Sequence, residues 1–131
     1  MDHSHIDLKG SQIASITETE SAIGIVFSRA LIIKRMTGSP ERTRWWQAGT
    51  LVLEDVATHR GLPPGPCHCV GGEIDENIYS YRDMIPIPFS SRGRIRCLLL
   101  LEGQDQPLVV EAGAVRLELD GVPKYIEHLR A

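Results

Sequence analysis

Short apolar runs separated by turn residues recur along the whole chain. The runs are rich in Ile, Leu and Val, and several alternate with polar residues at a period of two, as Val115, Leu117 and Leu119 do. No stretch keeps apolar residues at positions i, i+3, i+4 and i+7 over three turns, as an amphipathic helix needs. The pattern predicts an all-β fold: a single antiparallel β-sandwich or barrel-like domain of about 8–10 short strands, with a short C-terminal helical turn.

Two apolar segments define this prediction most clearly. Residues 22–36 alternate until Arg29 and Ala30, where the period slips. The slip predicts a bulge or a bend, and two strands joined tightly near residues 28–29 are the alternative. Residues 94–102 form the strongest predicted strand. Because residues 98–101 are four consecutive leucines, we expect that strand to be central and covered on both faces.

Prolines shape two other segments. Two prolines exclude residues 85–89 from a central strand, since each removes a backbone donor, so we expect an extended segment at an edge. Near the end of the chain, Pro123 suits a first helical position. Ile126 and Leu129 follow at a spacing of three residues. We therefore predict a short helical turn here that covers one end of the sheet.

Length and composition favour one domain. The chain has 131 residues, of which 42% are hydrophobic and 24% are charged. A chain of this length buries about two-thirds of the surface that its unfolded form exposes, whereas two independent domains would each bury little. The apolar fraction is too high for a disordered chain. We expect a single β domain over residues 1–131.

Charge and cysteine content narrow the classes of partner. The net charge of −3 shows no basic surplus of the kind that nucleic-acid-binding proteins carry. The sequence has no apolar run of about 18 residues and no N-terminal signal pattern. Its three cysteines are an odd number, whereas secreted domains usually carry an even, disulfide-forming set. We expect a cytoplasmic protein with no nucleic-acid partner, no membrane association and no bound cofactor.

A group of metal-binding residue types flanks a proline-rich loop. His59 precedes the loop, and Cys67, His68 and Cys69 follow it. Imidazole and thiolate are ligands that zinc, iron and copper accept. However, only one residue separates the two cysteines, whereas structural zinc sites place about two to four residues between the members of a pair. These four residues are the metal hypothesis, and metal-free loop side chains are the preferred interpretation.

Arginines recur at alternate positions in two places. Arg92, Arg94 and Arg96 would share one face of a strand, and Arg42 and Arg44 repeat the spacing. Two such rows side by side would form a surface that binds phosphate or carboxylate groups. The alternative is a solvated strand end whose arginines pair with the abundant acids. We prefer this alternative because the chain as a whole is acidic.

Two adjacent tryptophans are the candidate partner-binding residues. In a strand, the side chains of Trp45 and Trp46 point to opposite faces, so both are buried only where both faces are covered. An exposed tryptophan is typical of a binding hot spot. The alternative is an indole that packs beneath a loop or beneath the C-terminal turn.

The sequence favours a binding protein over an enzyme. It has no Gly-x-Ser-x-Gly motif and no phosphate-binding glycine loop. Our leading hypothesis is a non-catalytic β domain that binds a partner protein or self-associates as an accessory subunit. One alternative is a small-ligand-binding barrel in which Arg29 or Arg96 positions an anion. Another is a metal-dependent enzyme that uses the region of residues 59–69.

Overall fold

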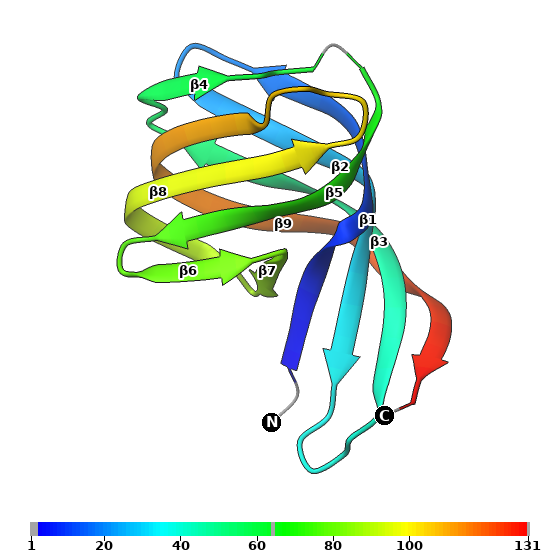
Figure 1. The fold of residues 1–131 in the computed structure, drawn as a ribbon. Helices are drawn as coiled ribbons and strands as arrows, with labels where there is room; N and C mark the ends of the chain where they lie inside the picture. Colours follow the sequence, from blue (N-terminus) through cyan, green and yellow to red (C-terminus); the bar gives the residue numbers. More distant parts are fainter. Residues whose placement is uncertain (1–2, 64, 131) are drawn as a thin grey trace.

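The computed structural model describes residues 3–63 and 65–130, which form nine strands (Figure 1). Within these residues, no helix has the length and apolar character to cross a membrane. The predicted all-β fold is confirmed. The strands are β1 (His3–Glu18), β2 (Ala22–Arg35), β3 (Arg42–Glu54), β4 (Thr58–Arg60), β5 (Cys67–Glu76), β6 (Tyr79–Arg82), β7 (Met84–Ile87), β8 (Ser90–Leu101) and β9 (Leu108–Leu129).

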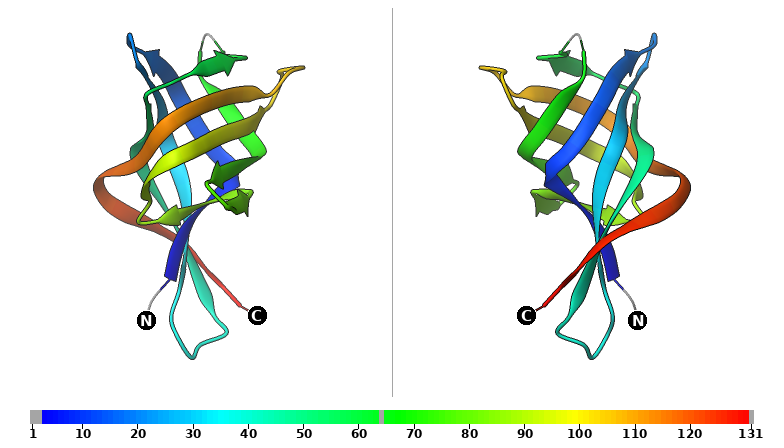
Figure 2. Two further views of the ribbon diagram at one scale, coloured as in Figure 1. Left: turned by 90° about the vertical axis from the view of Figure 1, so that its left-hand side faces the viewer. Right: turned by 90° about the vertical axis from the view of Figure 1, so that its right-hand side faces the viewer.

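The strands form one antiparallel sheet that curls back on itself. Its order is β6-β5-β8-β9-β3-β2-β1-β7, and β4 pairs with β9 beside this path. In addition, β1 pairs with β5 through Gln12 with His68 and Ile13 with Cys67. This contact joins two strands that lie far apart in the order. The sheet therefore becomes a curved, barrel-like layer around a single interior (Figures 1 and 2).

Aliphatic side chains and one aromatic ring fill that interior. Phe27 is 1% exposed, and every strand except β4 and β6 contributes a buried apolar residue. Full burial of such a side chain stabilises the fold by about 1.5–3 kcal/mol. The largest fully buried side chains are Phe27, Ile6, Leu8, Ile13, Ile23, Ile25, Ile32, Leu51, Leu53, Ile74, Ile85 and Ile95.

The paired ends of β1, β2, β3 and β9 continue beyond the curled sheet as a twisted extension (Figures 1 and 2). We call residues 3–7, 29–47 and 120–130 the extension, and the remaining described residues the body. In the extension, β3 pairs with β2 on one side and with the end of β9 on the other, while β1 pairs with β2. At its far end, β1 begins and β9 ends (Figure 1).

Two predictions about irregular strands are confirmed. The slip expected near residues 29–30 is a register shift between Phe27 and Ala30, where β2 pairs with β3. Because β2 continues through the shift as one strand, the alternative of two strands is wrong. The proline-containing segment lies in β7, which pairs with β1 at one end of the sheet order.

The leucine-rich strand is central but covered on one face only. It is β8, which lies between β5 and β9 in the sheet order. Leu99 and Leu101 are 0% and 4% exposed, whereas Leu100 between them is 45% exposed. The expectation of two covered faces was wrong because the sheet surrounds one interior and presents its outer face to solvent.

The predicted C-terminal helical turn is also wrong. The segment belongs to β9, where Lys124 pairs with Trp46 and Leu129 pairs with Arg42. A helix of two turns gains little by itself, whereas β3 offers a row of backbone donors and acceptors at this place. The register also shifts so that Ile126 lies between the residues that pair with Trp45 and Arg44. This extra residue produces the three-residue apolar spacing that resembled a helix.

Candidate binding surface on the extension

The register of the extension places the two tryptophans on opposite faces. Residues that are directly opposite on neighbouring antiparallel strands share a face, and successive residues alternate. One face, here the Trp45 face, consists of Ser4, Lys34, Thr43, Trp45, Tyr125 and His128. The other, here the arginine face, carries Arg29, Arg35, Arg42, Arg44, Trp46 and Lys124, together with Ile33 and Glu127, which are opposite Arg44.

Three contacts hold the indole of Trp45 in place. Its Nε1 donates a hydrogen bond of 2.8 Å to Oγ1 of Thr43. Its ring centroid lies 5.2 Å from that of Tyr125, and the two planes meet at 76° in an edge-to-face arrangement. The ammonium of Lys34 lies 4.5 Å from the indole centroid, within range of a cation–π interaction. The ring is therefore preorganised although it is only half-buried.

A hollow of about 420 Å³ opens beside this ring. Met36, in the turn between β2 and β3, is 63% exposed and, with the indole, supplies apolar lining to the hollow. Nε2 of His128 lies 2.9 Å from Oε2 of Glu41, and both residues line the hollow. An apolar wall with a few polar groups is typical of a binding site. The lining residues are Ser4, Lys34, Arg35, Met36, Ser39, Glu41, Thr43, Trp45 and His128.

The arginine face carries closely spaced cations. The guanidinium of Arg29 lies over the ring of Trp46 at 4.8 Å from its centroid. Arg35 is directly opposite Arg42, and Arg44 is two residues further along β3. Nη1 of Arg44 lies 3.5 Å from Oε1 of Glu127, whereas its Nε is buried without a hydrogen-bond partner among the described residues.

His5 lies close enough to these arginines for their positive charges to affect its pKa. Burial is the main cause that lowers the pKa of His5 below its ordinary value. The carboxylate of Asp7 opposes this shift, while the charges of Arg35 and Arg42 lower the pKa further. In the register, His5 is opposite Ile33 of β2 and Pro86 of β7, so apolar neighbours flank it on both sides.

The four metal candidates lie on two strands, β4 and β5. His59, in β4, faces Glu18, with 2.8 Å between Nε2 and Oε2. Cys69 is fully buried, and its thiol donates to the carbonyl of Gly71 at 3.3 Å, whereas Cys67 is half-buried and His68 exposed. Within residues 3–63 and 65–130, no three His, Cys, Asp or Glu side chains gather as a metal would require.

The thiols are poor nucleophiles for the same reason that they pack well. Burial raises the pKa of Cys69 to about 11 and that of Cys97 to about 12. Burial also raises the pKa of Cys67. Because their pKa values are raised, these thiols stay protonated near neutral pH. The thiolate is the form that reacts and binds metals, so the thiols are poor nucleophiles and poor ligands. Cys69 and Cys97 are interior apolar residues of the body.

The two predicted arginine rows do not meet. Arg92, Arg94 and Arg96 lie on β8 in the body, and a register shift between Arg92 and Ile95 interrupts their spacing. Asn77 receives a hydrogen bond from the backbone nitrogen of Arg94 and donates one to the carbonyl of Arg92. Arg96 instead lines a second hollow, of about 230 Å³, with Thr58, His59, Arg60, Val109 and Glu111.

Arg35 is the functional candidate that the sequence did not single out. It reaches Arg42 because β2 and β3 form a hairpin whose turn lies between these two residues. The turn residues at positions 37–41 were the available signal, since antiparallel pairing places the residues that flank a turn opposite each other. Tyr125 and His128 gave no comparable signal because their pairing with β3 joins segments about 80 residues apart in the chain.

Comparison of the chain with family models, curated proteins and solved structures finds no match.

Proposed function

We propose that this protein is a non-catalytic binding module whose extension holds a partner protein on the Trp45 face. The observation that carries the proposal is the hollow beside Trp45, with its fixed indole and the exposed side chain of Met36. Tyrosine and tryptophan dominate the energetics of protein interfaces, and methionine adapts to varied apolar partners. Tyr125, 55% exposed, extends the same aromatic surface.

The charges around the hollow define the chemistry of the partner. Lys34 and Arg35 line it, whereas Glu41 is already engaged by His128. An apolar side chain of the partner would fill the space between Trp45 and Met36. A carboxylate next to that side chain would approach Lys34 and Arg35. The occupant that we propose is therefore a protein segment in which an apolar residue adjoins an Asp or Glu.

The body offers less support for the alternative functions. Its interior is filled by aliphatic residues and Phe27, and Arg29 and Arg96, the arginines proposed to position an anion inside a barrel, both lie on the outer surface. The buried thiols have raised pKa values, which weakens the case for chemistry at cysteine. Of the functions considered, a binding role is the one that the surface supports best.

The test uses displayed random peptides and two matched variants. Peptides are selected on the wild-type protein, depleted on Trp45→Ala, and then measured individually by calorimetry. We expect enriched peptides to combine an apolar residue with a neighbouring acid and to lose about 30-fold or more in affinity on Trp45→Ala, as at a hot spot. Trp46→Ala, on the opposite face, serves as the control and should bind them normally.

Two outcomes contradict the proposal. One is that no peptide survives depletion, and the other is that the survivors bind both tryptophan variants equally. Thermal melting of both variants accompanies the assay, because Trp45→Ala also removes the edge-to-face contact with Tyr125. Lys34→Gln provides a second probe that leaves the indole in place and should weaken acidic peptides only.

A further inference from the structure

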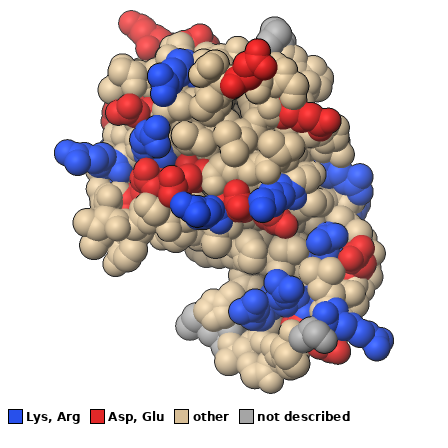
Figure 3. All heavy atoms as spheres, viewed as in Figure 1, with Lys and Arg blue, Asp and Glu red and all other residues tan. Residues whose placement is uncertain are grey.

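The extension and the rest of the chain differ in charge. Residues 3–7, 29–47 and 120–130 contain seven Lys and Arg against four Asp and Glu, whereas the remaining chain contains seven against thirteen. Figure 3 shows one side of this division: basic side chains gather over the extension, while both signs alternate on the body. The net acidity on which the expectation of no nucleic-acid partner rested is therefore a property of the body.

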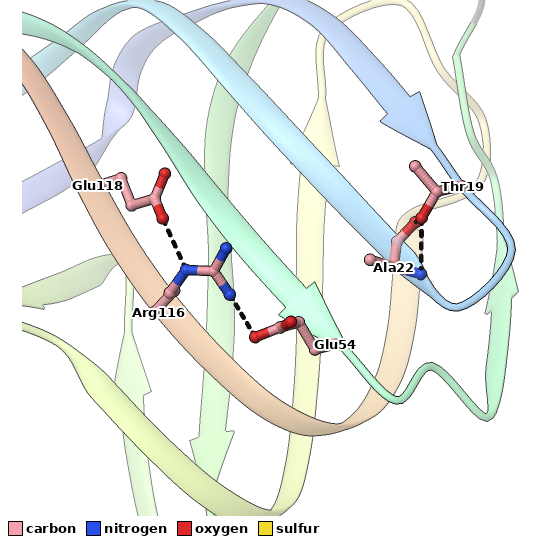
Figure 4. Close-up of polar contacts among 5 residues, drawn as sticks. All are labelled: Thr19, Ala22, Glu54, Arg116 and Glu118. Atoms are coloured by element: carbon pink, nitrogen blue, oxygen red, sulfur yellow. Dashed lines mark hydrogen bonds and ion pairs between the residues drawn. The ribbon is translucent and has the colours of Figure 1, made fainter.

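Two arginines of the extension, Arg35 and Arg42, differ from Arg116 of the body in their acidic neighbours. Arg116 of the body lies between two acids, with Nε 2.6 Å from Glu118 and Nη1 in contact with Glu54 (Figure 4). In the described part of the chain, neither Arg35 nor Arg42 lies within ion-pair distance of an acid, although they are directly opposite each other. Like charges at opposite positions of a sheet repel, so this arrangement favours an anion between them.

The cations follow a line along β3. Arg42, Arg44 and Trp46 occupy alternate positions of this strand, which places them about 6.7 Å apart in succession. Arg35 flanks one end of the line, and Arg29 and Lys124 flank the tryptophan at the other. The line is about 13 Å long, which suits a chain of several anionic groups better than a single small anion.

We propose that the arginine face binds single-stranded nucleic acid, with backbone phosphates on Arg35, Arg42 and Arg44 and a base beside Trp46. One guanidinium group can donate two parallel hydrogen bonds to the oxygens of a phosphate. Unpaired bases stack on aromatic rings such as that of Trp, and a neighbouring Arg adds to this interaction. Because the Nε of Arg44 is buried, a phosphate would bind the exposed part of its guanidinium group. The site lies on the face opposite the hollow, and of its three phosphate-binding arginines only Arg35 also lines the hollow, so it is a second activity beyond the proposed function.

Fluorescence anisotropy of labelled oligothymidylate, repeated at several salt concentrations, measures the interaction. Three neutralised phosphates predict a slope of log affinity against log salt of about −2, since each contributes about −0.7 on a single strand. We expect Arg42→Gln with Arg44→Gln to weaken binding about tenfold or more at low salt and to flatten the slope by more than half. Arg35→Gln, a single change at the same site, should flatten it by about a third.

A matched variant separates this site from general charge attraction. Arg82→Gln removes one positive charge, as Arg35→Gln does, but at an exposed arginine of β6 in the body. It should leave both affinity and slope unchanged. Trp46→Ala should weaken oligothymidylate but not inorganic polyphosphate, because only the former carries bases. Each variant is also melted, and removal of a repelling arginine is not expected to unfold the protein.

Three outcomes overturn the proposal. The first is that no oligothymidylate binds at low salt, and the second is that Arg82→Gln weakens binding as much as the double variant. The third is that polyglutamate, or duplex DNA of equal length, displaces the labelled strand as well as unlabelled oligothymidylate does. Polyglutamate would assign the face to an acidic protein, and the duplex would assign it to paired DNA.

Discussion

The strands β1, β2, β3 and β9 run through both the body and the extension, but their side chains are buried differently in the two regions. In the body, the second half of β3 alternates between fully buried Leu51 and Leu53 and partly exposed neighbours, because the sheet has one covered face. In the extension, Arg42–Trp46 of the same strand are all half-buried, since both faces contact solvent. The body can therefore bury enough apolar area for stability, whereas the extension provides two surfaces for recognition.

The extension keeps its shape by means other than a core of its own. Ile33 is 4% exposed although it lies on the arginine face, opposite His5 and Arg44. Long arginine side chains cover apolar neighbours with their methylene groups while the charged ends stay in water. On the arginine face, the same residues therefore serve recognition and packing, whereas the body separates these roles on its outer and inner faces.

The largest expected effect is the loss of a body core side chain. Phe27→Ala removes a fully buried ring and should lower the free energy of unfolding by about 3–5 kcal/mol, because a cavity replaces its contacts. Urea denaturation measures this change. Val122→Ala, at a position 73% exposed in the extension, is the control and should change stability by about 0.5 kcal/mol or less. Similar losses in both variants would contradict the division between the two regions.

Gln47 links the two regions and gives an intermediate effect. It is 8% exposed, and its Nε2 donates to the carbonyls of Asp120 and Gly121 at 3.3 and 3.0 Å, where β9 leaves the body. Gln47→Leu keeps the volume but removes both hydrogen bonds, at a cost of about 1–2 kcal/mol.

Hydrogen exchange identifies the backbone amides whose protection Gln47→Leu lowers. We expect faster exchange at the amides of residues 124–129, which pair with β3, and little change in β8 of the body. Unchanged protection at the end of β9 would mean that Gln47 does not hold the extension to the body. Thr50→Val, a small change on the part of β3 that lies in the body, is the comparison.

Local patterns predicted the strands of the body and the point where β2 enters the extension. Alternation identified the strands, the slip at residues 29–30 identified the bulge in β2, and two prolines identified the edge strand β7. Each of these signals acts within a few neighbouring residues, because backbone geometry fixes the two-residue period and proline lacks a donor.

The register between distant segments was not available from the sequence. The pairing of Leu129 with Arg42 depends on where β9 ends after 22 residues. The three-residue spacing of Ile126 and Leu129 led to the prediction of a helical turn in place of this strand. Opposite faces for Trp45 and Trp46 followed from the period alone. Their partners, Tyr125 and Arg29, required the fold, as did the placement of Arg35 against Arg42.

The smallest effect has opposite signs in the two regions. Arg42→Gln removes one member of a like-charge pair and should raise the free energy of unfolding by about 0.2–1 kcal/mol, whereas Arg116→Gln removes contacts with two acids and should lower it. Thermal melting at low salt compares the two variants. Both differences should shrink as the salt concentration rises, because these charges are partly exposed and ions screen them. A destabilising effect of Arg42→Gln would mean that the free protein already offsets the repulsion between Arg42 and Arg35. This pair would then not favour a bound anion.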